Sequence, residues 1–229
     1  MQRHKRRKPR EYYAYVLDYL PMGNPTDRHP HHRNRELVQL VGEDYFMLLE
    51  GFPRRGVQID IGERVYVGPE GEINGRIYRR DKISRIDAEI EYNDLTTVAR
   101  DMLPQILEVI VRKNERVFVE FFNIADAITI RMHSLELLPG IGKKTLMRIL
   151  EAREQKPFES FEDIQERAKI DPVKVIIERI VSELQGNERY YIFACPPKQA
   201  QMAGAMYLGY LDKIYAKLGR PSLWEENRK

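Results

Sequence analysis

The spacing of apolar residues changes near residue 93, and this change restricts the chain to a fold with two unlike parts. Before it, apolar side chains alternate or form short runs between glycine-rich turns, which is typical of β-strands. After it, Leu103, Leu107 and Ile110 follow one another at intervals of four and three residues, which is typical of a helix with one buried face. We therefore predict the α+β class, with a β part followed by an all-helical part.

Residues 11–92 have the pattern of a small all-β unit. Five segments are predicted as strands: Tyr12–Leu20, Glu36–Val41, Tyr45–Glu50, Val57–Ile61 and Arg64–Gly68. A turn is expected at residues 74–75, and residues 76–90 should add one or two strands. Short strands with frequent glycine turns fit a barrel or a sandwich, and we favour an OB-like β-barrel. Such barrels commonly hold single-stranded or folded nucleic acid.

Residues 93–186 are predicted as the helical domain. Its first helix is expected at Leu95–Lys113, where Pro104 should kink the helix or divide it in two. The apolar run within Arg116–Ile130 fits either a strand or a buried helix. We favour a helix, because both flanks have helical patterns.

The string Leu-Leu-Pro-Gly-Ile-Gly-Lys-Lys-Thr-Leu at residues 137–146 is the strongest functional signal in the chain. A short helix at Ser134–Leu138 should end before Pro139, because the residue before a proline disfavours helical geometry. Gly140 and Gly142 permit a tight reversal of the backbone. A second helix is expected at Lys143–Glu154, so the string predicts a helix-hairpin-helix.

The first amide N–H groups of that second helix have no partner inside the helix, and with the helix dipole they favour an anion. Lys143 and Lys144 add positive charge at the same place. We predict that the hairpin binds nucleic-acid phosphate. The expected contacts are Gly140, Ile141, Gly142, Lys143, Lys144 and Thr145. The alternative is a compact turn between two helices with no ligand.

A second, weaker copy of the motif follows at residues 158–184. Ser160 is expected to cap one helix, and Asp171 with Pro172 should begin the next. Its hairpin lacks both glycines, so we expect it to pack against the first copy with little phosphate contact. His133, just before the first copy, is expected to be a helix cap or a surface residue.

The segment from Leu138 to Ile180 resembles the tandem helix-hairpin-helix domain of DNA-uptake and repair proteins. The wider chain, from about Tyr12 to Phe193, is similar to an archaeal family of unknown function that is described as RNA-binding. The strings that carry this resemblance are residues 15–19, 46–50, 62–68, 121–123 and 135–144. The resemblance implies a barrel followed by paired hairpins and a role close to RNA or translation. It implies no enzymatic activity. Leu146 departs from many hairpins, which have alanine there.

Both ends of the chain lie outside that resemblance. Residues 1–10 form a basic tail, expected to lie on phosphates. Its cations are Arg3, Lys5, Arg6, Arg7, Lys8 and Arg10. Residues 187–229 are expected to give a strand at Tyr190–Phe193 that returns to the barrel, then an amphipathic helix at residues 200–218. That helix either packs on the protein or docks onto a protein partner.

Metal sites and enzymatic activities find little support in the sequence. The histidines at positions 29, 31 and 32 have Asp27 as the only acid close by in sequence, and they lie among arginines, so we expect no metal. Neither a Walker phosphate loop nor a glycosylase pattern is found, and we expect a protein with no cofactor that is not an enzyme. The single cysteine, Cys195, indicates a reducing compartment. With no secretory or membrane-spanning segment, we expect a cytoplasmic protein and no membrane partner.

The combined expectation is a cytoplasmic adapter that binds nucleic acid. Net charge is only +3, from 38 basic and 35 acidic residues, so the total charge does not by itself indicate a nucleic-acid partner. The prediction depends instead on where the basic residues cluster. Structured RNA is the expected ligand, and the ribosome is a candidate partner. DNA in replication or repair is the alternative, because a hairpin reads backbone rather than bases. A protein-interaction scaffold is the remaining possibility.

Overall fold

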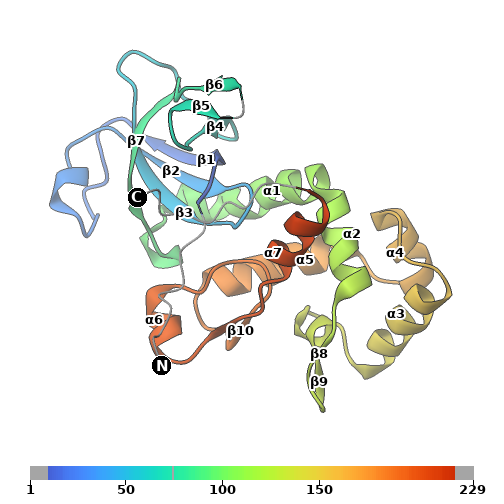
Figure 1. The fold of residues 1–229 in the computed structure, drawn as a ribbon. Coiled ribbons are helices and arrows are strands. Elements are labelled where there is room, and N and C mark those ends of the chain that lie inside the picture. The colour runs from blue at the N-terminus through green and yellow to red at the C-terminus, as the bar shows by residue number, and fades with distance from the viewer. Residues whose placement is uncertain (1–9, 74, 220–229) are drawn as a thin grey trace, which may run out of the picture. The chain divides into compact units, whose positions relative to one another are not determined.

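A computed structural model describes residues 10–73 and 75–219. The fold is α+β, with a five-stranded antiparallel sheet and seven α-helices among these residues (Figure 1). Contacts divide the chain after residue 102 into two compact units. We call them the first unit and the second unit and describe each by itself. No described helix has the length and apolar character needed to cross a membrane.

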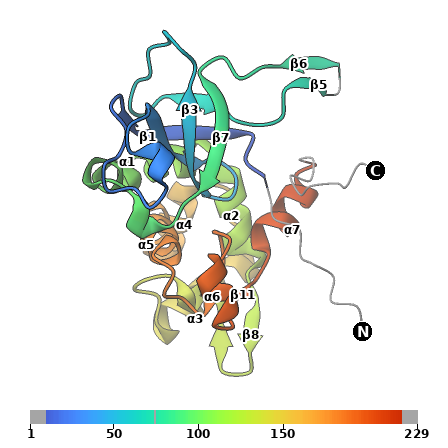
Figure 2. The ribbon, with the colours of Figure 1, turned by 90° about the vertical axis from the view of Figure 1, so that its left-hand side faces the viewer.

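The first unit is built on the five-stranded sheet, which curls into a half-barrel (Figures 1 and 2). Its strands lie in the order β4-β1-β2-β3-β7. Their bounds are Tyr13–Leu20 for β1, Leu37–Gly42 for β2, Leu48–Pro53 for β3, Arg64–Tyr66 for β4 and Ile83–Glu89 for β7. The edge strands β4 and β7 do not pair with each other within the described residues. One face buries an aliphatic core that includes Val16, Val38, Leu40, Val65 and Ile83.

A separate two-stranded ribbon, β5 (Gly71–Ile73) and β6 (Arg76–Tyr78), turns at Gly75, whose φ of 77° suits glycine. The prediction of a strand at Val57–Ile61 was wrong, because this segment pairs with no strand. Burial alternates only as far as Ile59, which is buried between the exposed Gln58 and Asp60, and Ile61 breaks the alternation because it is exposed. Turns at both ends isolate the segment from the sheet, so side-chain packing sets the alternation without any backbone ladder.

Helix α1 (Thr97–Lys113) crosses the boundary between the units, and α2 (Glu115–Ile124) follows it. Pro104 does not divide α1. It lies on the exposed side, where water can hydrate the carbonyl that a proline leaves without a donor. The break occurs instead at Asn114, whose side chain donates to the Ile110 carbonyl at 3.0 Å.

The expected helix at 116–130 is correct only up to Ile124. The residues after it form a hairpin of β8 (Ala127–Thr129) and β9 (Met132–His133). A 3₁₀ turn at Ser134–Leu137 then leads to three successive helices of the second unit. These are α3 (Lys143–Gln155), α4 (Phe161–Ala168) and α5 (Pro172–Leu184).

The C-terminal segment differs from both expectations for it. The expected returning strand, β10 (Tyr190–Tyr191), pairs in parallel with β11 (Met206–Tyr207) and not with the five-stranded sheet. The single helix expected at 200–218 is instead two helices, α6 (Lys198–Met202) and α7 (Tyr210–Lys217). Gly204 and Gly209, both at positive φ, end one helix and begin the other.

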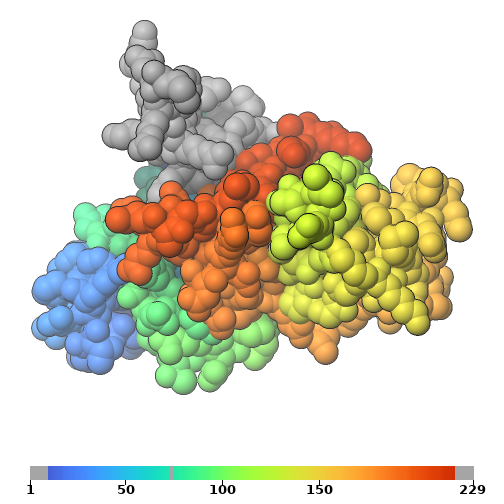
Figure 3. Space-filling model, turned by 90° about the horizontal axis from the view of Figure 1, so that it is seen from below, coloured from blue at the N-terminus to red at the C-terminus, as the bar shows by residue number. Residues whose placement is uncertain are grey.

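Helix α7 packs on its own unit. Leu211 and Ile214 are fully buried, and the Tyr210 ring meets Phe121 of α2 edge to face at 5.1 Å. In the space-filling view the red C-terminal segment lies against the yellow-green chain of the same unit (Figure 3). Met202 and Met206 remain exposed, so only part of the expected apolar stripe is buried.

Candidate nucleic-acid interface

The backbone reverses between the 3₁₀ turn and α3 through two hydrogen bonds, each between residues three apart in the chain. The Leu138 N–H donates to the Leu135 carbonyl at 3.1 Å, and the Ile141 N–H donates to the Leu138 carbonyl at 3.2 Å. Leu138 and Ile141 are buried and anchor the reversal, while Gly140 and Gly142 are exposed beside them. The reversal therefore presents its glycine backbone to solvent from a fixed base.

The two glycines are required for different reasons. Gly140 has a φ of 77°, which favours glycine over any residue with a side chain. Gly142 has a φ of −89°, which every residue adopts, and it is the N-cap of α3. A Cβ on Gly142 would have no atom within 4 Å. Neither backbone conformation nor steric contact inside the described chain therefore requires glycine at position 142.

The start of α3 is an open set of hydrogen-bond donors. Leu146 is the first residue whose N–H is bonded into the helix, to the Gly142 carbonyl at 2.9 Å. The amides of Lys143, Lys144 and Thr145 precede it and have no acceptor among the described residues. The positive end of the helix dipole lies at the same place. An anion that reached Gly142 would meet several oriented N–H groups.

The two lysines of the string have different environments. The Lys143 ammonium contacts Glu136 at 2.8 Å and donates to the Arg131 carbonyl at 3.1 Å. The hydrogen bond from Lys143 holds the pKa of Glu136 below its usual value. Lys144 is exposed and makes no ion pair with any residue that the structure describes. Lys144 is thus the free cation of the string, and Lys143 has a neighbouring carboxylate that the sequence did not reveal.

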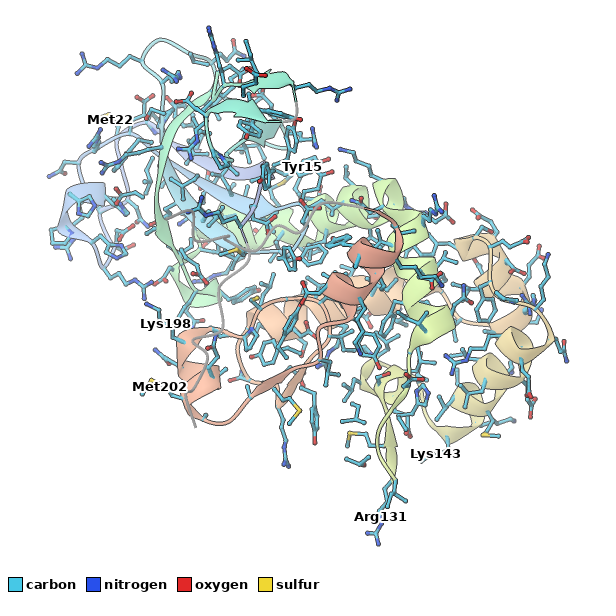
Figure 4. All side chains as sticks on the ribbon, in the orientation of Figure 1. Tyr15, Met22, Arg131, Lys143, Lys198 and Met202 are labelled. Atoms are coloured by element: carbon cyan, nitrogen blue, oxygen red, sulfur yellow. The ribbon has the colours of Figure 1, made fainter. Side chains whose placement is uncertain are left out.

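The β8–β9 hairpin lies beside the start of α3, and the Lys143 contact joins the two. Ile130 and Arg131 form its tip and are exposed (Figure 4). Sequence reasoning missed this hairpin, because it extended the preceding helix as far as Ile130. The exposed Arg131 side chain adds a cation at the tip of the β8–β9 hairpin.

His133 caps the turn that precedes the reversal. Its Nδ1 accepts the Leu135 N–H at 3.1 Å, while Glu136 accepts the His133 N–H at 2.8 Å. Burial lowers the pKa of His133, and the nearby Arg153 guanidinium lowers it further. The imidazole is therefore suited to stay neutral and to accept a hydrogen bond, and the expectation of a cap is confirmed.

The second hairpin is closed to anions by its own side chain. Lys169 ends α4 in the left-handed region at φ 55°, and the Asp171 carboxylate accepts the Lys174 N–H at 3.0 Å. A carboxylate at the start of α5 occupies the place where a phosphate would bind. The Arg148 guanidinium of α3 donates to the Ala168 carbonyl at 3.2 Å, so this copy is bonded to the first.

Arg179 of α5 connects the first hairpin to the C-terminal segment. It is 3% exposed, it is paired with Glu183 at 2.8 Å, and it donates to the Leu137 carbonyl at 3.1 Å. Burial raises the pKa of Glu183, although Arg179 opposes the shift. Glu183 also accepts the amides of residues 192–194 at 2.7–2.9 Å. This buried pair fixes the chain just before the glycines.

The basic tail falls mostly outside the described residues. Arg3, Lys5, Arg6, Arg7 and Lys8 lie there, and Arg10 is the first described residue and is exposed. The proposed phosphate role of the tail therefore stays a prediction.

Comparisons with known proteins show archaeal relatives of this chain. Residues 10–195 match the family model described as "Protein of unknown function (DUF655)". The uncharacterised protein MJ0038 of Methanocaldococcus jannaschii is 42% identical over 193 residues, which is 82% of this chain and 83% of that protein. The crystal structure of Af1531 from Archaeoglobus fulgidus is similar with a TM-score of 0.70 and 45% identity. It covers 81% of this chain and 100% of that one.

Proposed function

Because the chain belongs to the family described as protein of unknown function DUF655, a description that assigns no activity, we propose a function from the local geometry. The protein binds nucleic acid, and structured RNA is its ligand. The contact is a phosphate group held at residues 140–145. The observation that carries this proposal is Gly142, a glycine that the fold does not require, at the open start of α3.

The proposal interprets residues 134–184 as a tandem helix-hairpin-helix. In this interpretation the first copy is the binding copy, because its helix start is open and its glycines are exposed. The second copy is structural, because Asp171 already caps it. The curled sheet of the first unit is interpreted as an OB-like half-barrel, a type of fold that commonly binds nucleic acid.

A phosphate oxygen at the hairpin would accept hydrogen bonds from the free amides at residues 142–145. Such bonds to an anion are shorter and stronger than neutral ones. Lys144 would add a charge that no described carboxylate neutralises, and Thr145 would add a hydroxyl donor. Contacts of this kind fix the register of the protein on the backbone and do not distinguish one base from another.

The preference for RNA rests on the role close to RNA or translation that the sequence resemblance implied, since the family description assigns no ligand. The DNA alternative rests on the resemblance of the hairpins to DNA-uptake and repair proteins, and the experiment below separates the two. We propose a cytoplasmic binding protein without a catalytic step, with the ribosome as a candidate partner.

The test is the affinity of Gly142→Glu for a fluorescently labelled RNA hairpin and a matched DNA duplex. The variant places a carboxylate where the phosphate would bind, and we expect at least a tenfold loss of affinity with an unchanged circular dichroism spectrum. Gln165→Glu adds the same charge to an exposed position of α4 and should bind almost like the wild type. Equal affinities of Gly142→Glu and Gln165→Glu would refute the hairpin as the contact. If the wild-type protein bound the DNA duplex more tightly than the RNA hairpin, DNA and not RNA would be the proposed ligand.

A further inference from the structure

A cluster of imidazoles and carboxylates is enclosed in the first unit, outside the proposed interface. Asp27 and His29 lie in the connection between β1 and β2, and His32 ends a 3₁₀ turn at Pro30–His32. Glu50 comes from β3, and Asp87 comes from β7. Sequence reasoning found only Asp27 as an acid near these histidines. That was wrong, because the sheet brings in two more carboxylates from positions 18 and 55 residues beyond His32.

The side chains of this cluster are buried to an unusual degree for charged groups. The exposed fraction is 0% for His32, 1% for Glu50 and 4% for Asp27. Carboxylates are rarely buried unless they are paired or coordinate a metal ion. Asp27, Glu50 and Asp87 together bring three carboxylates to one imidazole ring, so the ring alone cannot balance their charge.

The ligand atoms are close enough to share one ion. The His32 Nδ1 atom lies 3.0 Å from Glu50 Oε2 and 3.2 Å from Asp27 Oδ2, and His29 Nδ1 lies 3.2 Å from Asp27 Oδ1. One such atom from each of these four residues falls within 4.8 Å of all the others. A tetrahedral ion with bonds of about 2.0–2.1 Å holds its ligand atoms about 3.3–3.4 Å apart. The three distances above lie within a few tenths of an ångström of this spacing, and the other pairs of ligand atoms, all within 4.8 Å, would close around the ion.

The neighbours of the cluster orient its atoms toward a common centre. His32 Nε2 lies 3.0 Å from Asp87 Oδ2, and a proton on Nε2 would leave the Nδ1 lone pair facing Asp27 and Glu50. A carboxylate that orients the far nitrogen of a histidine is the usual support of a metal ligand. The Gln39 amide donates to Glu50 Oε1 at 2.8 Å, which leaves Oε2 directed at His32.

Two atoms of the cluster are otherwise unsatisfied. Glu50 Oε2 and His29 Nδ1 are buried and have no hydrogen-bond partner among the described residues. A doubly protonated His32 is the competing explanation. Burial lowers the pKa of His32, but the hydrogen bonds with Asp87 and Asp27 outweigh burial and raise it overall. Even then, a single Nδ1 proton would serve two carboxylates, and the contact of His29 Nδ1 with Asp27 Oδ1 would still not be a hydrogen bond.

The arginines near the cluster are engaged elsewhere. Arg28 pairs with Asp94 at 3.0 Å, and the Arg35 guanidinium stacks on the Phe52 ring at 3.8 Å. Arg33 donates from Nε to the backbone carbonyl of Asp27 at 2.9 Å and not to its carboxylate. Arg85 pairs with Asp87, on the far side of the His32 ring from Nδ1. The expected repulsion of a cation is therefore reduced for Arg28 and Arg85, which carboxylates neutralise, whereas Arg33 and Arg35 keep their charge.

We propose that Asp27, His29, His32 and Glu50 bind one divalent first-row transition-metal ion of the zinc type. Four protein ligands, of which three are buried, make a closed site, which is typical of structural rather than catalytic metals. The ion joins the β1–β2 connection to β3. Two carboxylates balance its charge, and Asp87 orients His32 from outside. This site is independent of the hairpin function proposed above.

The test uses untagged full-length protein, so that no affinity tag supplies histidines. After removal of metal with a chelator, Zn²⁺ is added back, and bound metal is measured by mass spectrometry after desalting. We expect about one equivalent, and a rise in the melting temperature because the ion binds only the folded site. Co²⁺ in place of Zn²⁺ should give the intense visible absorption of tetrahedral coordination.

Two variants and one control assign the ligands. Glu50→Gln preserves the size of the side chain, and His29→Ala removes a partly exposed ring whose Nδ1 has no other partner; each should weaken Zn²⁺ binding at least tenfold. His31→Ala is the matched control, because its ring is 54% exposed and is outside the four proposed ligands. Wild-type protein that binds no Zn²⁺ or Co²⁺ would overturn the proposal in favour of a charged His32. Loss of metal in His31→Ala, with retention in His29→Ala, would overturn the assignment by moving the ion to His31, His32 and Asp87.

Discussion

Replacing each hairpin glycine by alanine should separate folding from binding. At Gly140 the φ of 77° makes an alanine side chain cost about 1–2 kcal/mol. Part of that cost, about 0.4–1 kcal/mol, is offset because alanine restricts the unfolded chain. We expect Gly140→Ala to destabilise the second unit by about 1 kcal/mol, a factor of about five in its unfolding equilibrium.

Gly142→Ala should behave differently, because its φ of −89° is unstrained and a Cβ there has no atom within 4 Å. The gain from the unfolded state is opposed by the weaker capping of alanine, so the net change in stability should be near zero. A methyl group would nevertheless keep a phosphate oxygen from the amides. Loss of one hydrogen bond to a charged group costs about 1.5–3 kcal/mol, so affinity for nucleic acid should fall at least tenfold.

Urea unfolding followed by far-ultraviolet circular dichroism measures the stabilities, and fluorescence anisotropy with labelled RNA measures the affinities. Because the chain has two units, the transition of the second unit must be fitted on its own. The reasoning is refuted if Gly142→Ala is stable and binds like the wild type, because the exposed amides would then not be the contact. A Gly142→Ala variant as unstable as Gly140→Ala would show that the fold does require glycine at position 142.

Three further predictions concern the supports of the hairpin. Arg179→Met leaves Glu183 buried without its cation and leaves the Leu137 carbonyl without its donor. Chemical denaturation should show that the free energy of unfolding falls by about 3–5 kcal/mol, and a fall of under 1 kcal/mol would contradict the role assigned to this pair. The pKa of His133 is lowered in the folded protein, so the stabilisation by its neutral ring is complete above the unfolded pKa near 6.5 and is lost as pH falls through the folded pKa. His133→Asn keeps a hydrogen-bond acceptor that does not titrate. The melting temperature of this variant should therefore fall less between pH 7.5 and 5 than that of the wild type. Lys144→Ala should reduce the slope of log affinity against log salt concentration by about 0.7–0.9, and Lys143→Ala should reduce it by less, because Glu136 already neutralises Lys143. Equal slopes for the two variants would contradict this difference between the lysines.

The sequence predicted the fold best where a local pattern and a specific residue agreed. Ser160 and Asp171 were expected to cap helices, and both side chains accept amide hydrogen bonds in the structure. The start of α3 was expected at Lys143 and is found there. Capping and proline geometry are local effects of a few residues, so they are readable in one sequence.

The errors arose where tertiary contacts decide the outcome. The alternation of apolar residues at Val57–Ile61 could not show that no strand pairs with this segment. In the C-terminal segment, the helical spacing of apolar residues suggested one helix, although Gly204 and Gly209 divide it into two. The Glu136 contact with Lys143 and the approach of Glu50 to His32 depend on which segments become neighbours in space. Sequence spacing indicates such neighbours within a helix or a strand, but not between strands that are far apart in the chain.

The contrast between the open start of α3 and the self-capped start of α5 has a mechanical consequence. A protein that binds a polymer through one contact can rotate about that contact, because a single contact fixes position and leaves orientation free. Two open hairpins would have clamped the strand and set its direction. With one of them closed by Asp171, any fixed orientation requires a second contact, and the exposed Arg131 at the tip of the β8–β9 hairpin is a cation able to supply one.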